Sequence, residues 1–313
     1  MGKIIRIGTR ESQLATWQAR QVADLLNSFG YNSELIFIKT EGDIDLHTPL
    51  YEMGVQGIFT KALDSALLQD KIDIAVHSMK DVPTQLASGL EQVAVLPRGP
   101  VRDLVVFKNK TEQEKYLLRS EDPSIPFTVA TSSIRRKAQW LHRFPNHQIE
   151  SLRGNINTRL QKLQDQPWNA AIFAQAGLER INLRPDCSLE LDWMLPAPAQ
   201  GAMVVLGRTE DEYIKTACQH FNDTPTELCT RVERDFLRTL LGGCSAPISA
   251  YAEWKDYSIL FKGNIFSLDG SKYKSVELVL SPSEATKGGR IAAQKLLAIG
   301  GQTIIDSIRN DGE

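Results

Sequence analysis

A cation and an anion stand side by side in the stretch IDIAVHSMKDVP, which runs from Ile72 to Pro83. The apolar run before them is short and rich in β-branched or small residues, a pattern typical of a buried parallel strand. Because such strands present ligands at their carboxyl ends, Lys80 could hold an acidic group while Asp81 stabilises positive charge or moves protons. The alternative is that Asp81 only nucleates the turn before Pro83.

Basic residues gather between Thr131 and Arg159, where Glu150 is the only acid. The cations there are Arg135, Arg136, Lys137, Arg143, Arg153 and Arg159. Most of the arginines open or flank two expected helices, and helix N-termini already offer unpaired N–H groups and a positive dipole end. The sequence therefore predicts anion sites here, to which the hydroxyl groups of residues 131–133 add donors.

The implied ligand carries several negative groups, because Arg10 and Lys80 follow two other expected strands. Arginine forks suit carboxylates and phosphates. No G-x-x-x-x-G-K-[ST] loop and no G-x-G-x-x-G turn is present to cradle a nucleotide, so a polycarboxylate is favoured. The alternative for part of the set is a solvated helix face, and Lys137 and Arg143 are the candidates for it.

Cys244 lies in the loop LLGGCSAPISAYA, directly after an expected helix end and two glycines. A thiol in such a loop could be a covalent attachment point. A self-sufficient cysteine nucleophile is not supported, because a helix C-terminus does not activate a thiol and no base is adjacent. The alternative, a small buried residue, stays open for Cys244 and is the interpretation of Cys187, Cys218 and Cys229.

The elements that would position these residues repeat one theme: a strand, a turn with a basic or hydroxyl residue, and a helix. The theme recurs after KIIRIG, FTVA and QIESL, and it predicts an α/β fold with parallel sheets. Glycine and proline at 98–103 and 196–202 indicate that the chain crosses from one domain to another there. AMVVLG, which follows the second crossing, is too short to form a domain of its own.

The composition changes from about Thr226 onwards. A helix is expected up to Gly242, followed by PISAYAEW, SILFKGNIF and KSVELVL as antiparallel strands. Asp269 and Gly270 are a hairpin signal between the last two strands, and a final helix at about 283–299 would cover the sheet. These features predict a small α+β domain.

The overall composition is that of an ordinary globular protein of two or three domains, since 313 residues exceed the roughly 100 to 200 residues of one domain. Hydrophobic residues make up 42% and charged residues 24%, which favours neither disorder nor a membrane protein. The net charge of -2 disfavours nucleic acid as a partner.

Without a signal peptide or an apolar run near 18 residues, the protein is expected to be cytoplasmic. The cysteines show no C-x-x-C spacing or zinc signature, so neither disulfides nor a metal is expected.

Five motifs, in this order, resemble the hydroxymethylbilane synthase family, also called the porphobilinogen deaminases, over nearly the whole chain. They are IGTRESQLATWQA, IDIAVHSMKDVPT, ATSSIRRKAQ, SLRGNINTRL and LGGCSAPISAYA. The resemblance implies a transferase that joins four porphobilinogen molecules head to tail with loss of ammonia, then releases 1-hydroxymethylbilane by hydrolysis for tetrapyrrole and haem biosynthesis. It also implies a dipyrromethane cofactor, two porphobilinogen units held by a thioether to the loop cysteine.

The resemblance assigns roles to residues that match the family motifs. It implies that Cys244 carries the cofactor, and that Asp81 is the catalytic aspartate, which contacts pyrrole nitrogens and stabilises cationic azafulvene and pyrrolenine species. The positions expected to bind the cofactor's acetate and propionate groups are Lys80, Thr131, Ser133, Arg135 and Arg136. Those expected on the side of the substrate and growing chain are Arg10, Ser12, Arg153, Arg159 and Arg180.

The family plan implies two α/β domains like periplasmic binding proteins with a central cleft, plus a small C-terminal α+β domain with the cysteine loop. On that plan domain 1 spans 1–98 with 202–221 returning to it, domain 2 spans 103–197, and domain 3 spans 226–313. The expected protein is a monomer that acts on a small molecule.

Some positions depart from the commonest family pattern. Gln56 stands where a G-K-G motif would place a cofactor-side lysine, a contact for which Lys61 could compensate. Glu150 replaces a basic residue, and Ala130 and Ala199 replace glycines. None of these changes removes a predicted catalytic group.

Two other classes of protein fit part of the pattern. A binding protein would close a two-lobed cleft on an anionic ligand without chemistry, but it needs neither Asp81 among cations nor a glycine-flanked Cys244. An enzyme acting on phosphate esters would need metal-binding carboxylates or a phosphate loop, and the sequence has no motif for either. The synthase is therefore favoured.

Overall fold

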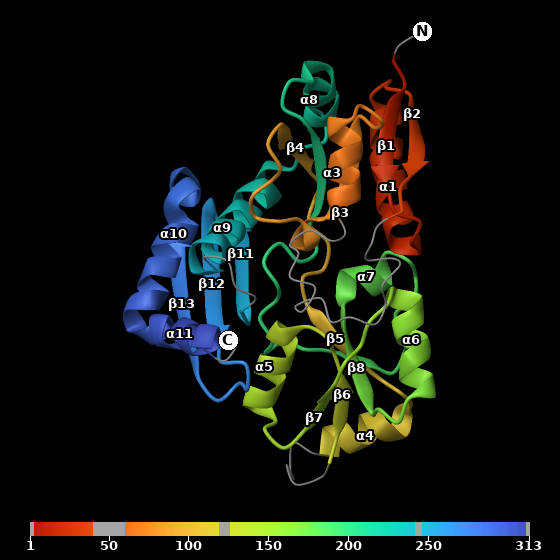
Figure 1. Ribbon diagram of the computed structural model, residues 1–313. Coiled ribbons are helices and arrows are strands. Elements are labelled where there is room, and N and C mark those ends of the chain that lie inside the picture. The colour runs from red at the N-terminus through yellow and green to blue at the C-terminus, as the bar shows by residue number, and fades with distance from the viewer. Residues whose placement is uncertain (1–2, 40–59, 119–125, 242–245, 311–313) are drawn as a thin grey trace. The chain divides into compact units, whose positions relative to one another are not determined.

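The computed structural model describes residues 3–39, 60–118, 126–241 and 246–310. The chain folds into two compact units (Figure 1). The first unit contains the described residues up to Gly99 and returns with Gln200–Leu228, and the second contains Pro100–Ala199 and the described chain from Cys229 onwards. The first unit is therefore built from separate parts of the chain.

The first unit is built on a five-stranded sheet with the strand order β2-β1-β3-β10-β4. Its strands are β1 (Ile5–Thr9), β2 (Ser33–Phe37), β3 (Ile74–Ser78), β4 (Leu90–Val95) and β10 (Met203–Arg208). Its described helices are α1 (Gln13–Ser28), α3 (Lys61–Leu68) and α8 (Glu212–Gln219), with a 3₁₀ turn η1 at Met79–Asp81. Strand β1 runs parallel to β2 and β3, whereas β10 runs antiparallel to β3 and β4.

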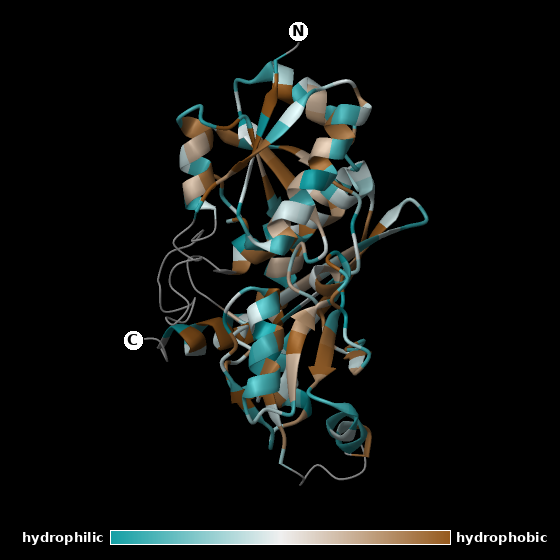
Figure 2. Ribbon diagram, turned by 90° about the vertical axis from the view of Figure 1, so that its right-hand side faces the viewer, coloured by the Kyte–Doolittle hydropathy of each residue, from teal (hydrophilic) through white to brown (hydrophobic). Residues whose placement is uncertain are grey.

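Helix α1 forms where a cap and an apolar face coincide. The Ser12 hydroxyl accepts a hydrogen bond from the Ala15 backbone N–H at 3.4 Å, and Gly30 follows the helix with a φ of +83°. Val22 and Leu26 of α1 pack on one face of the sheet, which α8 also covers. Figure 2 shows hydrophobic strands with hydrophilic residues on the helices around them, so the core lies between the sheet and its helices.

The second unit contains another five-stranded sheet, with the order β7-β6-β8-β5-β9. Its strands are β5 (Asp103–Phe107), β6 (Thr128–Ala130), β7 (Gln148–Glu150), β8 (Ala170–Ala174) and β9 (Ser188–Glu190). The helices beside it are α4 (Lys110–Leu118), α5 (Ile134–Arg143), α6 (Ile156–Asp165) and α7 (Gln175–Glu179). One face packs on Trp140 of α5 and the other on Leu163 of α6 and Leu178 of α7, so both faces are buried.

The C-terminal part of the chain forms a three-stranded antiparallel sheet with helices against it. The strands are β11 (Ile248–Lys255), β12 (Ser258–Phe266) and β13 (Tyr273–Leu280). The helices are α9 (Thr224–Leu241), α10 (Ala285–Leu296) and α11 (Gln302–Asn310), with short turns η2 (Pro282–Glu284) and η3 (Leu297–Gly301). Phe236 of α9 meets Phe261 of β12 edge to face at a ring separation of 5.1 Å, which ties α9 to the sheet.

The predicted fold class is confirmed by two α/β sheets and a C-terminal α+β part. The prediction of purely parallel sheets is wrong for β10 and β5, each of which runs antiparallel to its neighbours. A strand buried on both faces is apolar whichever way it runs, so its residue pattern does not reveal its direction. The central cleft of the predicted class stays a prediction.

The predicted final helix at about 283–299 is confirmed by α10, which ends at Leu296 and passes into η3, but the further helix α11 from Gln302 was not predicted. Between them Gly300 has a φ of +107°, a left-handed conformation that interrupts the helix. The strands β5 and β9 and the helices α4 and α8 were not predicted. Helix α4 buries none of its residues, so it has no apolar face to signal it. Within the described ranges, no helix combines the length and apolar character needed to cross a membrane.

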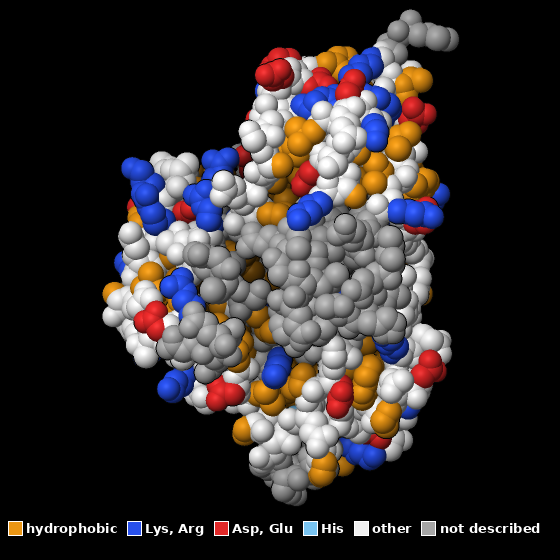
Figure 3. Space-filling view, in the orientation of Figure 1, with side chains coloured by type: hydrophobic (Ala, Val, Ile, Leu, Met, Phe, Trp, Pro, Cys, Tyr) orange, Lys and Arg blue, Asp and Glu red, His pale blue; other side chains and the backbone are white. Residues whose placement is uncertain are grey.

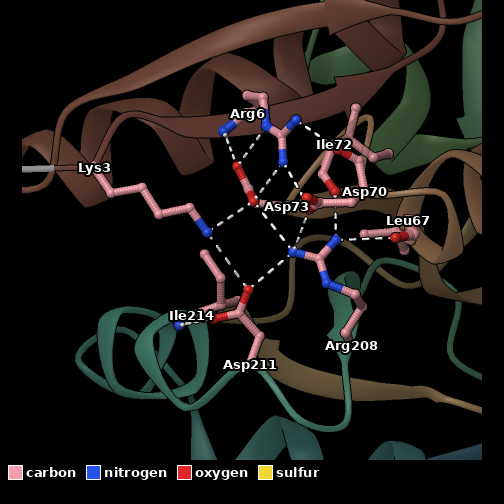
Figure 4. Close-up of polar contacts among 9 residues, drawn as sticks. All are labelled: Lys3, Arg6, Leu67, Asp70, Ile72, Asp73, Arg208, Asp211 and Ile214. Carbon is pink, nitrogen blue, oxygen red and sulfur yellow. Dashed lines mark hydrogen bonds and ion pairs between the residues drawn. The ribbon is translucent and has the colours of Figure 1, made fainter.

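A network of charges joins β1, β3 and β10 at the amino-terminal edge of β1 and β3 (Figure 4). The buried Asp73 carboxylate accepts hydrogen bonds from the backbone N–H and the Nε of Arg6, both at 2.9 Å. Lys3 Nζ lies 3.0 Å and Arg208 Nη2 lies 3.2 Å from the same carboxylate. Figure 3 shows acidic and basic side chains intermixed on the surface of this unit.

We expect Asp73→Asn to lower the free energy of unfolding by about 3 kcal/mol, because the substitution removes one partner of a buried ion pair. Burial would raise the pKa of Asp73, but hydrogen bonds from Arg6 and Lys3 outweigh burial and hold that pKa well below its usual range. The stabilisation is therefore present above about pH 4, near the pKa of an unfolded aspartate, and is lost as the pH falls further. Urea unfolding at neutral pH and near pH 3 measures both effects.

Asp70→Asn is the matched control, because the Asp70 side chain is 72% exposed although it bonds the same Arg6. Its loss should cost less than about 1 kcal/mol. The difference between wild type and Asp73→Asn should shrink near pH 3. Equal losses for the two variants, or no change with pH, would contradict the role given to Asp73.

Candidate functional site

The predicted residues of the first unit lie at the carboxyl edge of β1 and β3, which are parallel neighbours and end at the same side of the sheet. Arg10 follows β1 and Ser12 caps α1, whereas Lys80 and Asp81 lie in η1 directly after β3. Arg10, Ser12 and Lys80 are half-buried, and Asp81 is exposed. The structure therefore brings four predicted residues to one edge.

Two glutamines outside the predicted set hold this edge together. Gln18 of α1 donates a hydrogen bond to the Ser78 hydroxyl at 2.8 Å. Gln200 is 1% exposed, and its Oε1 accepts a hydrogen bond from Lys80 Nζ at 3.1 Å. The backbone oxygen of Gln200 accepts another from Arg98 Nε at 2.9 Å. An uncharged side chain thus helps to orient the Lys80 ammonium group.

His77 of β3 is a buried neighbour of this edge. Burial, and then the charge of Arg10, lower the pKa of His77 to about 4, so its imidazole is uncharged at neutral pH. No described residue bonds its Nε2 atom. Arg10 and Lys80, rather than the histidine, therefore supply positive charge near the end of β3.

The predicted residues of the second unit follow its three parallel strands β6, β7 and β8, which end at one edge. Thr131 and Ser133 follow β6, Arg153 and Arg159 follow β7, and Arg180 is the C-cap of α7 after β8. Thr131 and Arg153 are buried, and the other three are half-buried. Burial lowers the pKa of Arg180 to about 10, which still leaves the side chain charged at neutral pH.

The turn after β6 is built by the predicted hydroxyl residues. The Thr131 N–H donates to the Glu150 carbonyl oxygen at 2.8 Å, and Thr131 Oγ1 accepts from the Ser133 N–H at 3.2 Å. The Ser133 hydroxyl caps α5 by accepting from the Arg136 N–H at 3.4 Å. These residues therefore form a helix N-terminus, where the dipole favours anions.

Arg135 and Arg136 both bind a carboxylate of the protein itself. Asp103 is fully buried, and its two oxygens lie 2.6 Å from Arg135 Nη2 and 2.8 Å from Arg136 Nη2. Arg135 Nη1 also donates to the Leu195 carbonyl at 2.7 Å, and Arg136 Nη1 donates to the Ile172 carbonyl at 2.9 Å. The protein thus holds the two guanidinium groups side by side. Their role as cofactor ligands stays a prediction.

The cluster of Arg135, Arg136 and Asp103 keeps a capacity to bind an anion. Two guanidinium groups and one carboxylate carry a net positive charge. A guanidinium has five N–H donors, and toward the described residues Arg135 makes two hydrogen bonds and Arg136 makes three. A carboxylate could accept charge-assisted hydrogen bonds from the remaining donors. Since Arg135 is 5% and Arg136 is 6% exposed, such a ligand would contact only a small part of each side chain.

Cys244 and Gln56 lie outside the described residues. The other cysteines form no disulfide within the described part of the chain; Cys218 and Cys229 are buried and Cys187 is half-buried. Burial raises the pKa of the Cys218 thiol to about 12. The interpretation as small buried residues is therefore confirmed for Cys218 and Cys229, and is only partly right for Cys187. Among the described residues, no group of three potential ligands could hold a metal ion.

The supporting residues were missed because they lie outside the motifs. Asp103 opens the buried strand β5, and a signal for it existed: an acid at the start of an apolar strand needs a partner when it is buried. Gln200 lies in the segment predicted as a crossing, and no signal identified it, because a neutral amide at such a place implies no particular partner.

Comparison with known proteins places this chain in a family. A model described as "Porphobilinogen deaminase, dipyromethane cofactor binding domain" matches residues 5–216, and "Porphobilinogen deaminase, C-terminal domain" matches residues 227–298. A porphobilinogen deaminase of Acidithiobacillus ferrooxidans is 38% identical over 310 residues, which cover 98% of each chain. A porphobilinogen deaminase of Chlorobium phaeobacteroides is 38% identical over 317 residues, which cover 99% of each chain.

A solved structure of a probable amino-acid ABC transporter extracellular-binding protein from Bacillus subtilis is also similar. It is 13% identical and covers 70% of this chain and 92% of its own, with a TM-score of 0.40. A TM-score this low supports no conclusion. The family matches span both the arginine-bearing part of the chain and its C-terminal part, and the relatives align over nearly their full length. This chain therefore belongs to the porphobilinogen deaminase family.

Proposed function

We propose that this protein is a hydroxymethylbilane synthase. It condenses four porphobilinogen molecules head to tail onto a dipyrromethane primer with loss of ammonia, and then releases 1-hydroxymethylbilane by hydrolysis. The observation that carries the proposal is the match of the cofactor-binding domain to residues 5–216. The cationic sheet edges of both units support it, because porphobilinogen and its oligomers are polycarboxylates that suit arginine and lysine donors.

The donor sets at these edges fit the carboxylates of the cofactor and substrate. We assign the cofactor's acetate and propionate groups to Lys80, Thr131, Ser133, Arg135 and Arg136. We assign the carboxylates of the substrate and growing chain to Arg10, Ser12, Arg153, Arg159 and Arg180. When bound, dipyrromethane supplies the pyrrole carbon to which the first porphobilinogen is joined. The hydrogen bonds of Arg135 and Arg136 to Asp103 support the assignment, because they hold two donors in one place before a ligand arrives.

Asp81 is proposed as the catalytic residue that contacts the pyrrole nitrogen of the reacting unit. Positive charge develops on that nitrogen when ammonia leaves, and a fixed carboxylate lowers the energy of this charge. The exposure of Asp81 on η1, next to Lys80, supports the role, because a ligand whose carboxylate is held by Lys80 could also reach Asp81. Cys244 is proposed as the thioether anchor of the cofactor.

We propose three domains. Domain 1 consists of residues 1–98 together with 202–221, domain 2 of residues 103–197, and domain 3 of residues 226–313. The position of β10 between β3 and β4 supports the return of the chain to the first domain. The separate C-terminal family match over 227–298 supports the third. We also propose a cytoplasmic monomer that acts on a small molecule without nucleic acid or membrane. The net charge of -2 supports the absence of a nucleic-acid partner.

The mass of the denatured protein, measured after incubation with porphobilinogen, tests this function. We expect the protein mass to exceed that of the bare chain by the mass of two condensed porphobilinogen units. We also expect one ammonia to be released for each further unit consumed. Peptide mapping should place the excess on the peptide that contains Cys244. A protein that binds porphobilinogen without covalent excess or ammonia release would instead be a binding protein.

A further inference from the structure

A buried hydrogen bond connects the helix of the arginine pair with the C-terminal sheet. Gln139 of α5 donates from Nε2 to the Ser249 hydroxyl of β11 at 3.0 Å. Gln139 is 4% exposed and Ser249 is fully buried. Both residues belong to the second unit. A hydrogen bond between two buried side chains costs free energy when one partner is lost, so this contact holds β11 against α5.

The same glutamine belongs to the network that positions the arginines. Gln139 Nε2 donates to the Leu195 carbonyl at 3.0 Å, and Gln139 Oε1 accepts from the Leu195 N–H at 2.9 Å. Arg135 lies one turn earlier on α5, and its Nη1 donates to the same Leu195 carbonyl at 2.7 Å. Residues four apart lie on the same face of a helix, so Arg135 and Gln139 can both donate hydrogen bonds to the carbonyl of Leu195. The network therefore runs from Asp103 through Arg135 and Gln139 to Ser249.

A second contact fixes the far end of α5 to the same sheet. His142 Nδ1 and the Gly270 carbonyl of the β12–β13 turn are 2.8 Å apart. Gly270 has a φ of +76°, and a Cβ atom there would lie 2.3 Å from the Ala138 carbonyl oxygen. The hairpin turn thus approaches the helix backbone closely. Of the two contacts, the one made by Gln139 lies within one turn of the arginines.

We propose that the Gln139–Ser249 hydrogen bond is a positioning contact for cofactor attachment. This inference rests on the proposed function. Ser249 lies in β11 and follows the proposed anchor Cys244 by five residues in the sequence. Gln139 follows Arg135 and Arg136 by one turn on α5. The contact fixes the strand next to the anchor relative to the groups that bind the cofactor's carboxylates, and such preorganisation speeds a reaction that needs both at once. Neither residue is a catalytic residue, because both act through others.

The test measures how fast the apo-protein becomes covalently loaded. Apo-protein of the wild type and of Ser249→Ala is incubated with porphobilinogen, and intact mass is followed over time. We expect Ser249→Ala to load about fivefold more slowly, the effect of losing one ordinary hydrogen bond. Turnover divided by the loaded fraction should stay within about twofold of wild type, since the reacting groups are unchanged. Ser258→Ala removes a half-buried hydroxyl from the same sheet and is the matched control.

A double-mutant cycle separates positioning from general stability. If the two side chains act through their mutual bond, Gln139→Leu combined with Ser249→Ala should load no more slowly than Gln139→Leu alone. The proposal would be overturned if Ser249→Ala loaded at the wild-type rate. It would also be overturned if loading slowed only in proportion to a lower melting temperature of the variant. Additive effects in the double variant would overturn it as well. Wild-type apo-protein that gains no mass at all would refute the proposed function itself, and this inference with it.

Discussion

Asp81→Asn is expected to reduce turnover by about 100- to 1000-fold, the loss typical of removing a fixed group that stabilises transition-state charge. The variant replaces a carboxylate with an amide of the same shape, so it removes the charge proposed to stabilise cationic pyrrole species. Because Asp81 is exposed on η1, the change should cost little stability. Release of ammonia in a single turnover measures the chemical step directly.

The matched control for this variant is Glu210→Gln, which removes an exposed carboxylate from the same unit. It should turn over at the wild-type rate. Intact mass should show the full cofactor on both variants, since neither residue is proposed to hold it. Turnover of Asp81→Asn within a few fold of wild type would remove Asp81 from the proposed mechanism. A loss of attached cofactor would change its role from catalysis to binding.

Cys244→Ser is expected to give a folded protein that never acquires the cofactor and has no measurable turnover. The serine hydroxyl is a far weaker nucleophile than a thiolate at neutral pH, so we expect no ether bond to form in place of the thioether. Intact mass after incubation with porphobilinogen should equal the mass of the bare chain. Circular dichroism and thermal unfolding establish that the variant is folded.

Cys187→Ser is the control for this second prediction, because Cys187 is a half-buried free thiol of the second unit. It should load and turn over like the wild type. A covalent excess that persists in Cys244→Ser and disappears in Cys187→Ser would move the anchor to Cys187. Full activity of Cys244→Ser would exclude a thioether at that position.

Elements whose signals are local could be predicted from the sequence. The Asp269–Gly270 turn lies where the sequence indicates, because a tight turn depends on a few adjacent residues. The directions of β5 and β10 could not be predicted in this way. A strand acquires its direction from the neighbours it pairs with, and those neighbours are distant in the sequence.

The residues of the candidate site could likewise be predicted only in part. The order of strand, turn and helix was enough to place Arg10, Lys80 and Asp81 at strand ends. It was not enough to find the partners that orient the cations. Asp103 lies 32 residues from Arg135, and Gln200 lies 120 residues from Lys80. The apolar strand after Asp103 indicates that this acid needs a partner, but local composition does not identify the partner in either pair.

By itself, the sequence determined which charged and nucleophilic groups the protein has and which of them follow strands, because spacing and turn residues are local properties. Only the tertiary structure decided which cations are paired and buried. Arg135 and Arg136 are like any arginines of a basic helix in the sequence, yet both share the buried carboxylate of Asp103. The physical reason is that desolvation and ion pairing depend on all groups within a few ångströms, and folding brings those groups from distant parts of the chain.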